Sequence, residues 1–187
     1  MALRDFSGKV ILITGAAGGL GAALCHRFAA ADARIAAMDL DRERLNALVS
    51  SLPSGTLAID GNIADPSMCE AATRQTVAHF GALDCLINNA GISHRSLFQE
   101  TDTDAIRRVM EVNFFGAMQM THAALPHLIE THGVVAAISS VAGYAPLLGR
   151  TGYAASKHAL HGFFDSLRAE IEDRGVGVTL VCPSFIA

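Results

Sequence analysis

The chain has 187 residues, of which 51% are apolar and 17% charged, and its formal net charge is −4. This length suits one domain with a substantial core, so we expect a single domain over residues 1–187. The small negative charge and the lack of a basic tract argue against a nucleic-acid partner or an anionic membrane surface. The apolar residues fall in runs too short to span a bilayer, so we also expect no membrane segment.

The four cysteines are scattered and, like the histidines, show no metal-ligand spacing, so we expect no metal site. Free thiols are typical of a reducing compartment. The first residues have no apolar core ahead of their charges, as a signal peptide would require. We therefore expect a cytoplasmic protein.

Strand-like and helix-like segments alternate along the whole chain. The apolar runs predict strands at residues 9–14, 34–39, 56–60, 83–88, 133–139 and 176–182. Helical patterns predict helices at residues 19–31, 41–51, 66–80, 102–131 and 151–173, and Pro126 is expected to kink or break the fourth. This alternation predicts an α/β fold of Rossmann type, with a doubly wound parallel sheet between two layers of helices.

A glycine-rich turn joins the first strand to the first helix. Its sequence runs from Thr14 through Gly15, Gly19 and Leu20 to Gly21. Such a turn lets the backbone approach a pyrophosphate, whose charge then lies at the helix N-terminus. A glycine-rich turn can also be purely structural, but its position after the first strand favours a dinucleotide site.

The second strand ends at Asp39. A carboxylate there can accept hydrogen bonds from both ribose hydroxyls of an adenosine and would repel a 2′-phosphate. The alternative is that Asp39 or Asp41 merely caps the next helix. We expect Arg42 and Arg44 to point to solvent, which leaves no cation for a 2′-phosphate, so the pattern favours NAD over NADP.

Tyr153 and Lys157 are four residues apart in the sequence Tyr-Ala-Ala-Ser-Lys. In a helix they would share one face, and an ammonium beside a phenol stabilises the phenolate. This is what a tyrosine needs to act as a general acid or base. The same spacing also occurs by chance on solvated helices, so the rest of the chain has to decide.

Five motifs together resemble those of the short-chain dehydrogenase/reductase (SDR) family, in its order and at its spacings. They are Thr14-Gly15-x-x-x-Gly19-x-Gly21, Asn88-Asn89-Ala90-Gly91, Asn113, Ser140 and Tyr153-x-x-x-Lys157. The resemblance implies hydride transfer between NAD and a secondary alcohol or ketone. It implies a catalytic tetrad of Asn113, Ser140, Tyr153 and Lys157, with Ser139 as the rival of Ser140 and an ordinary buried asparagine as the alternative for Asn113.

The resemblance also implies a cofactor site. Asn62 and Ile63 replace the Asp-Val pair that touches the adenine in the family, which is a mild departure. The expected cofactor-binding residues are Gly15, Gly19, Leu20, Gly21, Asp39, Asn62, Ile63, Asn89, Ala90, Gly91, Tyr153, Lys157, Pro183 and Ile186.

The substrate pocket should follow the fourth and fifth strands, where several residues are apolar. The candidates are Ser93, His94, Val141, Tyr144, Pro146, Leu147 and Leu148. This set suggests an apolar alcohol or ketone, with His94 as the one histidine that could face it.

Family members continue beyond Pro183-Ser184 into a substrate-covering lid and a seventh strand. We therefore expect a sequence truncated relative to the family. The alternative to an active oxidoreductase is an NAD-binding module without turnover. The resemblance further implies a homodimer or homotetramer formed through the helices at 102–131 and 151–173.

Overall fold

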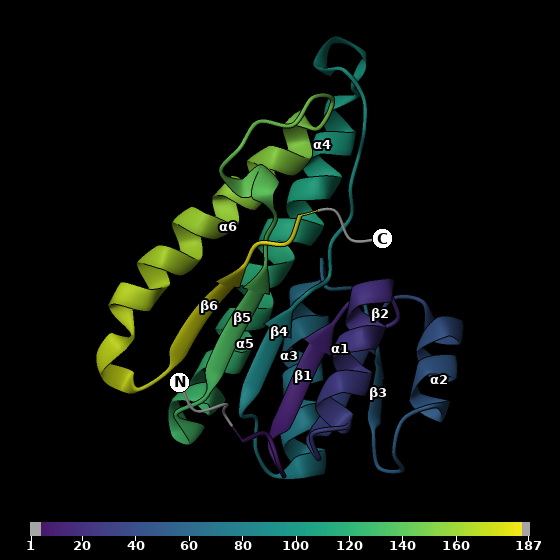
Figure 1. Ribbon diagram of the computed structural model, residues 1–187, viewed down its shortest axis with the longest axis vertical. Helices are drawn as coiled ribbons and strands as arrows, with labels where there is room; N and C mark the ends of the chain where they lie inside the picture. Colours follow the sequence, from purple (N-terminus) through teal and green to yellow (C-terminus); the bar gives the residue numbers. More distant parts are fainter. Residues whose placement is uncertain (1–4, 185–187) are drawn as a thin grey trace.

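A computed structural model describes residues 5–184 of the chain. One sheet of six parallel strands has the order β3-β2-β1-β4-β5-β6 (Figure 1). The strands are β1 (Val10–Thr14), β2 (Arg34–Asp39), β3 (Leu57–Asp60), β4 (Cys85–Asn88), β5 (Val134–Ile138) and β6 (Gly177–Val181). The Rossmann-type doubly wound sheet expected from the alternating pattern is therefore confirmed.

Helices cover the sheet on both sides. They are α1 (Gly19–Ala29), α2 (Arg42–Ser50), α3 (Pro66–Phe80), α4 (Thr103–Met110), α5 (Gly116–Thr131) and α6 (Thr151–Glu170). Successive side chains of a strand point to opposite faces, so Ile11 and Ile13 pack with α1 and α2 while Leu12 packs with α3, α5 and α6. All residues of β1 are buried for this reason.

Local sequence signals account for several helix boundaries. Asp65 caps α3 by accepting a hydrogen bond from the backbone N–H of Ser67, and Pro66 follows at the first turn. Gly81 ends the same helix in the left-handed conformation, with φ +84°. Asp41 caps α2 through the N–H of Arg44. These residues predict where the helices begin and end.

The predicted helix over 102–131 is in fact three segments. A π-helix (Glu111–Phe115) separates α4 from α5. Pro126 lies inside α5, which continues to Thr131, so of the two expectations, a kink or a break, the break is wrong. Three short 3-10 helices, η1 (Phe98–Glu100), η3 (Val141–Gly143) and η4 (Glu172–Arg174), were not expected from the pattern.

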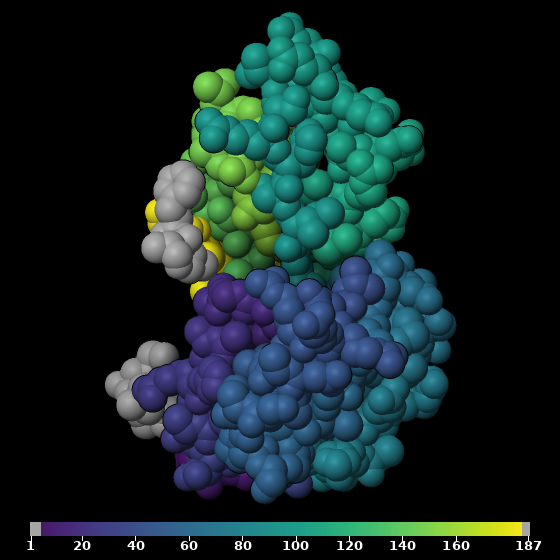
Figure 2. Space-filling view, turned by 90° about the vertical axis from the view of Figure 1, so that its right-hand side faces the viewer, coloured from purple at the N-terminus to yellow at the C-terminus, as the bar shows by residue number. Residues whose placement is uncertain are grey.

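The strand order reverses between β1 and β4, since β1 pairs with β2 on one side and β4 on the other. In an open parallel sheet such a switch point leaves a crevice at the carboxyl ends of the strands. At the surface, the first part of the chain (purple to blue) forms the lower body in Figure 2, and the teal and green segments rise above it. No helix among residues 5–184 is both long and apolar enough to cross a membrane.

Candidate active site

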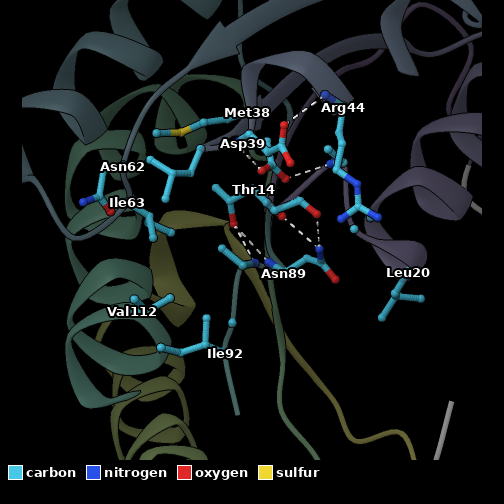
Figure 3. Close-up of a pocket in the computed structure, with 18 of the residues that line it drawn as sticks. Thr14, Leu20, Met38, Asp39, Arg44, Asn62, Ile63, Asn89, Ile92 and Val112 are labelled. Atoms are coloured by element: carbon cyan, nitrogen blue, oxygen red, sulfur yellow. Dashed lines mark hydrogen bonds between the residues drawn. The ribbon is translucent and has the colours of Figure 1, made fainter. Parts of the chain in front are cut away.

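A cavity of about 540 Å³ lies at the switch point (Figure 3). It is lined by the residues that follow β1, β2, β3 and β4. They include Gly15, Gly19, Leu20, Gly21, Asp39, Asn62, Ile63, Asn89, Ala90 and Gly91, together with Thr14, Met38, Arg44, Gly61, Ile92 and Val112. Ten of the fourteen expected cofactor residues therefore line one cavity, which we call the first cavity.

The glycine-rich turn is tightly packed. Gly15 has a φ of +62°, and a Cβ on it would lie 2.7 Å from the Cα of Ala90. A Cβ on Gly21 would lie 2.1 Å from the carbonyl oxygen of Gly15. Only glycine fits either position. A Cβ on Gly19 would meet nothing within 4 Å, so this part of the turn is open toward the cavity.

Thr14 and Asn89 hold the turn against the end of β4. The Thr14 hydroxyl oxygen accepts from the N–H groups of Asn89 and Ala90, both at 3.1 Å. The Asn89 side-chain amide donates to the carbonyls of Thr14 and Gly15, both at 2.9 Å. Asn89 thus shapes the cavity through the backbone as well as lining it (Figure 3).

Asp39 lies at the end of β2 and is not the cap of α2, which is Asp41. Its carboxylate accepts hydrogen bonds from the N–H of Ala17 at 2.8 Å and of Asp41 at 3.0 Å. Asp39 therefore fixes the glycine-rich turn and still lines the cavity. Each carboxylate oxygen retains lone-pair capacity for a further donor.

The two arginines near Asp39 are both exposed, as expected, but they have different neighbours. Arg42 forms an ion pair with Asp60 at 2.6 Å. Arg44 lines the first cavity beside Asp39 (Figure 3). It reaches the cavity because its backbone N–H is fixed by the Asp41 cap, which places Arg44 in the first turn of α2 directly after β2.

A second cavity of about 320 Å³ adjoins the first, with which it shares Leu20, Asn89, Gly91 and Ile92. The other residues that line it come from the segment after β4, from β5 and the segment after it, from α6 and the residue before it, and from the segment after β6. They are Ser93, Ile138, Ser139, Ser140, Val141, Leu147, Arg150, Tyr153, Lys157, Pro183 and Ser184. Three of the four expected tetrad residues thus line one wall of this second cavity.

Tyr153 and Lys157 share a face of α6, as their spacing predicts. The Lys157 Nζ lies 5.7 Å from the centroid of the Tyr153 ring and donates to the carbonyl of Ile138 at 2.7 Å. Lys157 is only 5% exposed. Burial lowers the pKa of its ammonium to about 8, because desolvation disfavours the charged form.

Asn113, the fourth residue of the expected tetrad, lies in the π-helix and is 1% exposed. Its side chain accepts from the N–H of Ile92 at 2.8 Å and donates to the carbonyl of Ile92 at 2.9 Å. It also donates to the Ser156 hydroxyl at 3.0 Å, which in turn donates to the carbonyl of Tyr153 at 2.7 Å. Asn113 therefore connects the end of β4 with the first turns of α6.

The two adjacent serines differ in how their hydroxyl groups are used. Ser139 donates its proton to the carbonyl of Lys157 at 3.4 Å. The Ser140 oxygen accepts from the N–H of Ala142 at 3.2 Å, which leaves its own proton for another acceptor. This arrangement favours Ser140 over Ser139 as the donor to a substrate oxygen.

The expected substrate residues divide into two groups. Ser93, Val141 and Leu147 line the second cavity. His94, Tyr144, Pro146 and Leu148 line neither of the two cavities, so their contact with a substrate stays a prediction. The segment after η3 leaves Tyr144 62% exposed with its ring against His161, and it leaves Leu148 86% exposed.

Two residues of this region have roles that the sequence reasoning missed. Ser156 links Asn113 to Tyr153, and Arg150 lines the second cavity with its guanidinium carbon 5.9 Å from the centroid of the Tyr153 ring. Arg150 lies directly before both α6 and the expected helix over 151–173, so helical spacing did not reveal its position beside Tyr153. The expected contact of Ile186 lies outside the described residues.

No group of three or more histidine, cysteine, aspartate or glutamate side chains that could hold a metal ion occurs within residues 5–184. Burial raises the pKa of the Cys25 and Cys69 thiols to about 12, so both stay protonated at neutral pH. The titratable side chains that line the second cavity are those of Arg150, Tyr153 and Lys157.

The chain is similar to a known family and to several curated proteins. The family model for short chain dehydrogenases matches residues 9–187. The cattle (Bos taurus) protein dehydrogenase/reductase SDR family member 7B is 40% identical over an alignment that covers 95% of this chain and 58% of the relative. The Arabidopsis thaliana protein 11-beta-hydroxysteroid dehydrogenase-like 2 is 36% identical, with coverage of 98% and 61%. The chain thus spans less than two thirds of the length of these relatives.

Solved structures give the same result. A short-chain dehydrogenase from Streptomyces avermitilis is 32% identical with a TM-score of 0.91, over 97% of this chain and 67% of that one. A short chain dehydrogenase/reductase from Burkholderia phymatum, solved in complex with NAD, is 25% identical with a TM-score of 0.93, over 98% and 68%. Together with the match over residues 9–187, these likenesses identify the chain as a member of the short-chain dehydrogenase family.

Proposed function

We propose that the protein is an NAD-dependent oxidoreductase that interconverts a secondary alcohol and a ketone by hydride transfer. The observation that carries the proposal is the junction of the two cavities. The first offers a nucleotide-sized space at the switch point, and the second places Ser140, Tyr153 and Lys157 around its far end.

The first cavity fits a dinucleotide. The open side of the turn at Gly19 leads to the N-terminus of α1, which has no side-chain cap and so keeps free N–H groups for a pyrophosphate. Asp39 lies at the far end for an adenosine ribose. The NAD complex of the Burkholderia neighbour supports this choice of cofactor. NAD, when bound, supplies the nicotinamide that accepts or donates the hydride.

In the proposed oxidation Tyr153 takes the hydroxyl proton of the alcohol, and in reduction it returns a proton to the developing alkoxide. Ser140 donates a hydrogen bond to the same substrate oxygen and stabilises its negative charge. Lys157 stabilises the phenolate of Tyr153 by its positive charge. Asn113 fixes the position of the segment after β4 relative to the Tyr153 backbone. We also assign Asn113 to the path by which a proton reaches Lys157.

The substrate itself is proposed to be at least partly apolar. Ile92, Val141 and Leu147 line the second cavity beside the catalytic side chains. Apolar walls with a few polar groups are typical of small-molecule sites. The compartment and the oligomeric state, a homodimer or homotetramer in the cytoplasm, stay predictions.

The test has two stages. NADH is first titrated against the protein by its fluorescence, and a panel of apolar secondary alcohols is then assayed with NAD by the appearance of NADH absorbance. We expect saturable NADH binding and turnover of at least one alcohol. NADH binding without turnover of any alcohol in a broad panel would contradict the proposed enzymatic activity and support a nucleotide-binding module instead.

A further inference from the structure

The second cavity contains a cation for which the proposed hydride transfer has no use. Arg150 directly precedes α6, and its guanidinium donates a hydrogen bond to the Ser93 hydroxyl across the cavity. The guanidinium carbon lies 5.9 Å from the centroid of the Tyr153 ring. These two contacts hold the charge next to the place where a substrate would react.

The charge of Arg150 has no counter-ion among the described residues. The arginines in ion pairs are Arg42, Arg74, Arg107 and Arg168, and each has a carboxylate partner on the surface. Arg150 forms no such pair, although it is less exposed than these four. The described lining of the second cavity contains two cations, Arg150 and Lys157, and no aspartate or glutamate.

The guanidinium also has free hydrogen-bonding capacity. It carries five N–H donors in a planar fork, and only one is used, in the bond to Ser93. Two parallel N–H groups match the two oxygens of a carboxylate better than any neutral acceptor. The N-terminus of α6 lacks a side-chain cap, so its helix dipole adds positive potential beside Arg150.

We propose that Arg150 selects a substrate that carries a carboxylate close to its carbinol or ketone carbon. The substrate would then be an apolar hydroxy acid or keto acid, with its hydrocarbon part against Ile92, Val141 and Leu147 and its carboxylate on Arg150. This inference rests on the proposed function, because it names the substrate class of the same site. The proposed substrate differs from the apolar alcohol or ketone expected from the sequence in that it also carries a carboxylate.

Equilibrium binding tests the proposal without turnover. Phenylacetate and its neutral isostere phenylacetamide are titrated into NADH-saturated protein by calorimetry, at low and high salt. We expect the wild type to bind the carboxylate about tenfold more tightly than the amide, since a charge-assisted hydrogen bond is stronger than a neutral one. Arg150→Gln should abolish this preference, Arg150→Lys should keep part of it, and added salt should weaken it.

Arg107→Gln is the matched control, because Arg107 lies on α4, pairs with exposed Asp104 and lines neither cavity. It should keep the full preference. The NADH dissociation constant of each variant reports on the fold. Equal binding of the two probes by the wild type, no binding of phenylacetate, or an unchanged preference in Arg150→Gln would overturn the proposal.

These results separate the two proposals. A protein that prefers phenylacetate through Arg150 but transfers no hydride contradicts the proposed function alone. A protein that oxidises alcohols while Arg150→Gln leaves the preference intact contradicts only the role of Arg150.

Discussion

The two cavities share four lining residues, but backbone groups shape one of them and side chains shape the other. The first is shaped by backbone: Gly15 and Gly21 pack where no Cβ fits, and the side chains of Thr14 and Asn89 bind main-chain groups of the turn and of the end of β4. The second is shaped by side chains, with Tyr153 and Lys157 from one helix facing Ser140 from the segment after β5.

This difference separates two tasks. A backbone-built site holds a ligand by shape and by N–H groups, which any cofactor with the same phosphates can use. A side-chain site performs proton transfer and sets substrate choice, so each residue there has an individual effect. Substitutions in the second cavity should therefore alter turnover or substrate preference, and those in the first should alter cofactor affinity.

Tyr153→Phe is expected to give the largest effect. Removing the hydroxyl takes away the general acid or base, so turnover should fall about a thousandfold. NADH affinity should stay nearly the same, because Tyr153 lines only the second cavity. Turnover is measured with the best alcohol of the panel and affinity by NADH fluorescence.

Tyr144→Phe is the matched control for this variant. Tyr144 is the other tyrosine of the chain and lines neither cavity. It should keep full turnover. If Tyr153→Phe were as active as Tyr144→Phe, or lost NADH binding together with turnover, the division between the two cavities would be wrong.

The difference between backbone-shaped and side-chain-shaped regions also explains which parts of the fold and of the site could be predicted from the sequence. The turn from Gly15 to Gly21 was visible because glycine spacing reports backbone geometry directly. The alternation of strands and helices likewise gave the sheet and so the position of the switch point. Tyr153 and Lys157 were predictable because four residues are one helical turn.

What the sequence could not show depends on the course of loops and on helix rotation. Tyr144 and Leu148 have suitable residue types, but the segment after η3 turns them outward. Arg44 is exposed, as expected, but its helix position alone did not show that it also lines the first cavity. The π-helix around Asn113 has no local signal of the kind that glycine or proline gives.

Lys157 provides a second prediction, on stability. Its pKa is about 8 in the folded protein, below the ordinary 10.5. Between these pH values the unfolded chain carries the proton and the folded protein does not, so the free energy of unfolding should rise with pH. Relative to Lys157→Met, the wild type should gain about 3 kcal/mol over this range, at 1.36 kcal/mol per unit of pKa.

Urea unfolding of both proteins at a series of pH values measures this gain. Taking the difference between the two proteins cancels the other groups that titrate over the same range. Below pH 8 the difference should be constant, because Lys157 is then protonated in both states. A difference that does not vary with pH would mean that Lys157 is not desolvated, and the second cavity would then hold no buried charge.

The smallest expected effect concerns the choice between NAD and NADP in the first cavity. Asp39→Asn should weaken NAD about tenfold through the loss of a charge-assisted hydrogen bond to the ribose. NADP should lose less or gain, because the repulsion of its 2′-phosphate disappears while Arg44 still lines the cavity. In the double variant Asp39→Asn with Arg44→Gln, the affinity for NADP relative to that for NAD should fall again.

The ratio of the two dissociation constants is the informative quantity here. Asp39 also accepts from the N–H groups of Ala17 and Asp41, and asparagine cannot replace both bonds equally, so some loss will be common to the two cofactors. Asp60→Asn, a neighbour in the sheet register that pairs with Arg42 and lies outside the cavity lining, should leave the ratio unchanged. If Asp39→Asn also left it unchanged, Asp39 would serve only to shape the turn, and the first cavity would be backbone-built throughout.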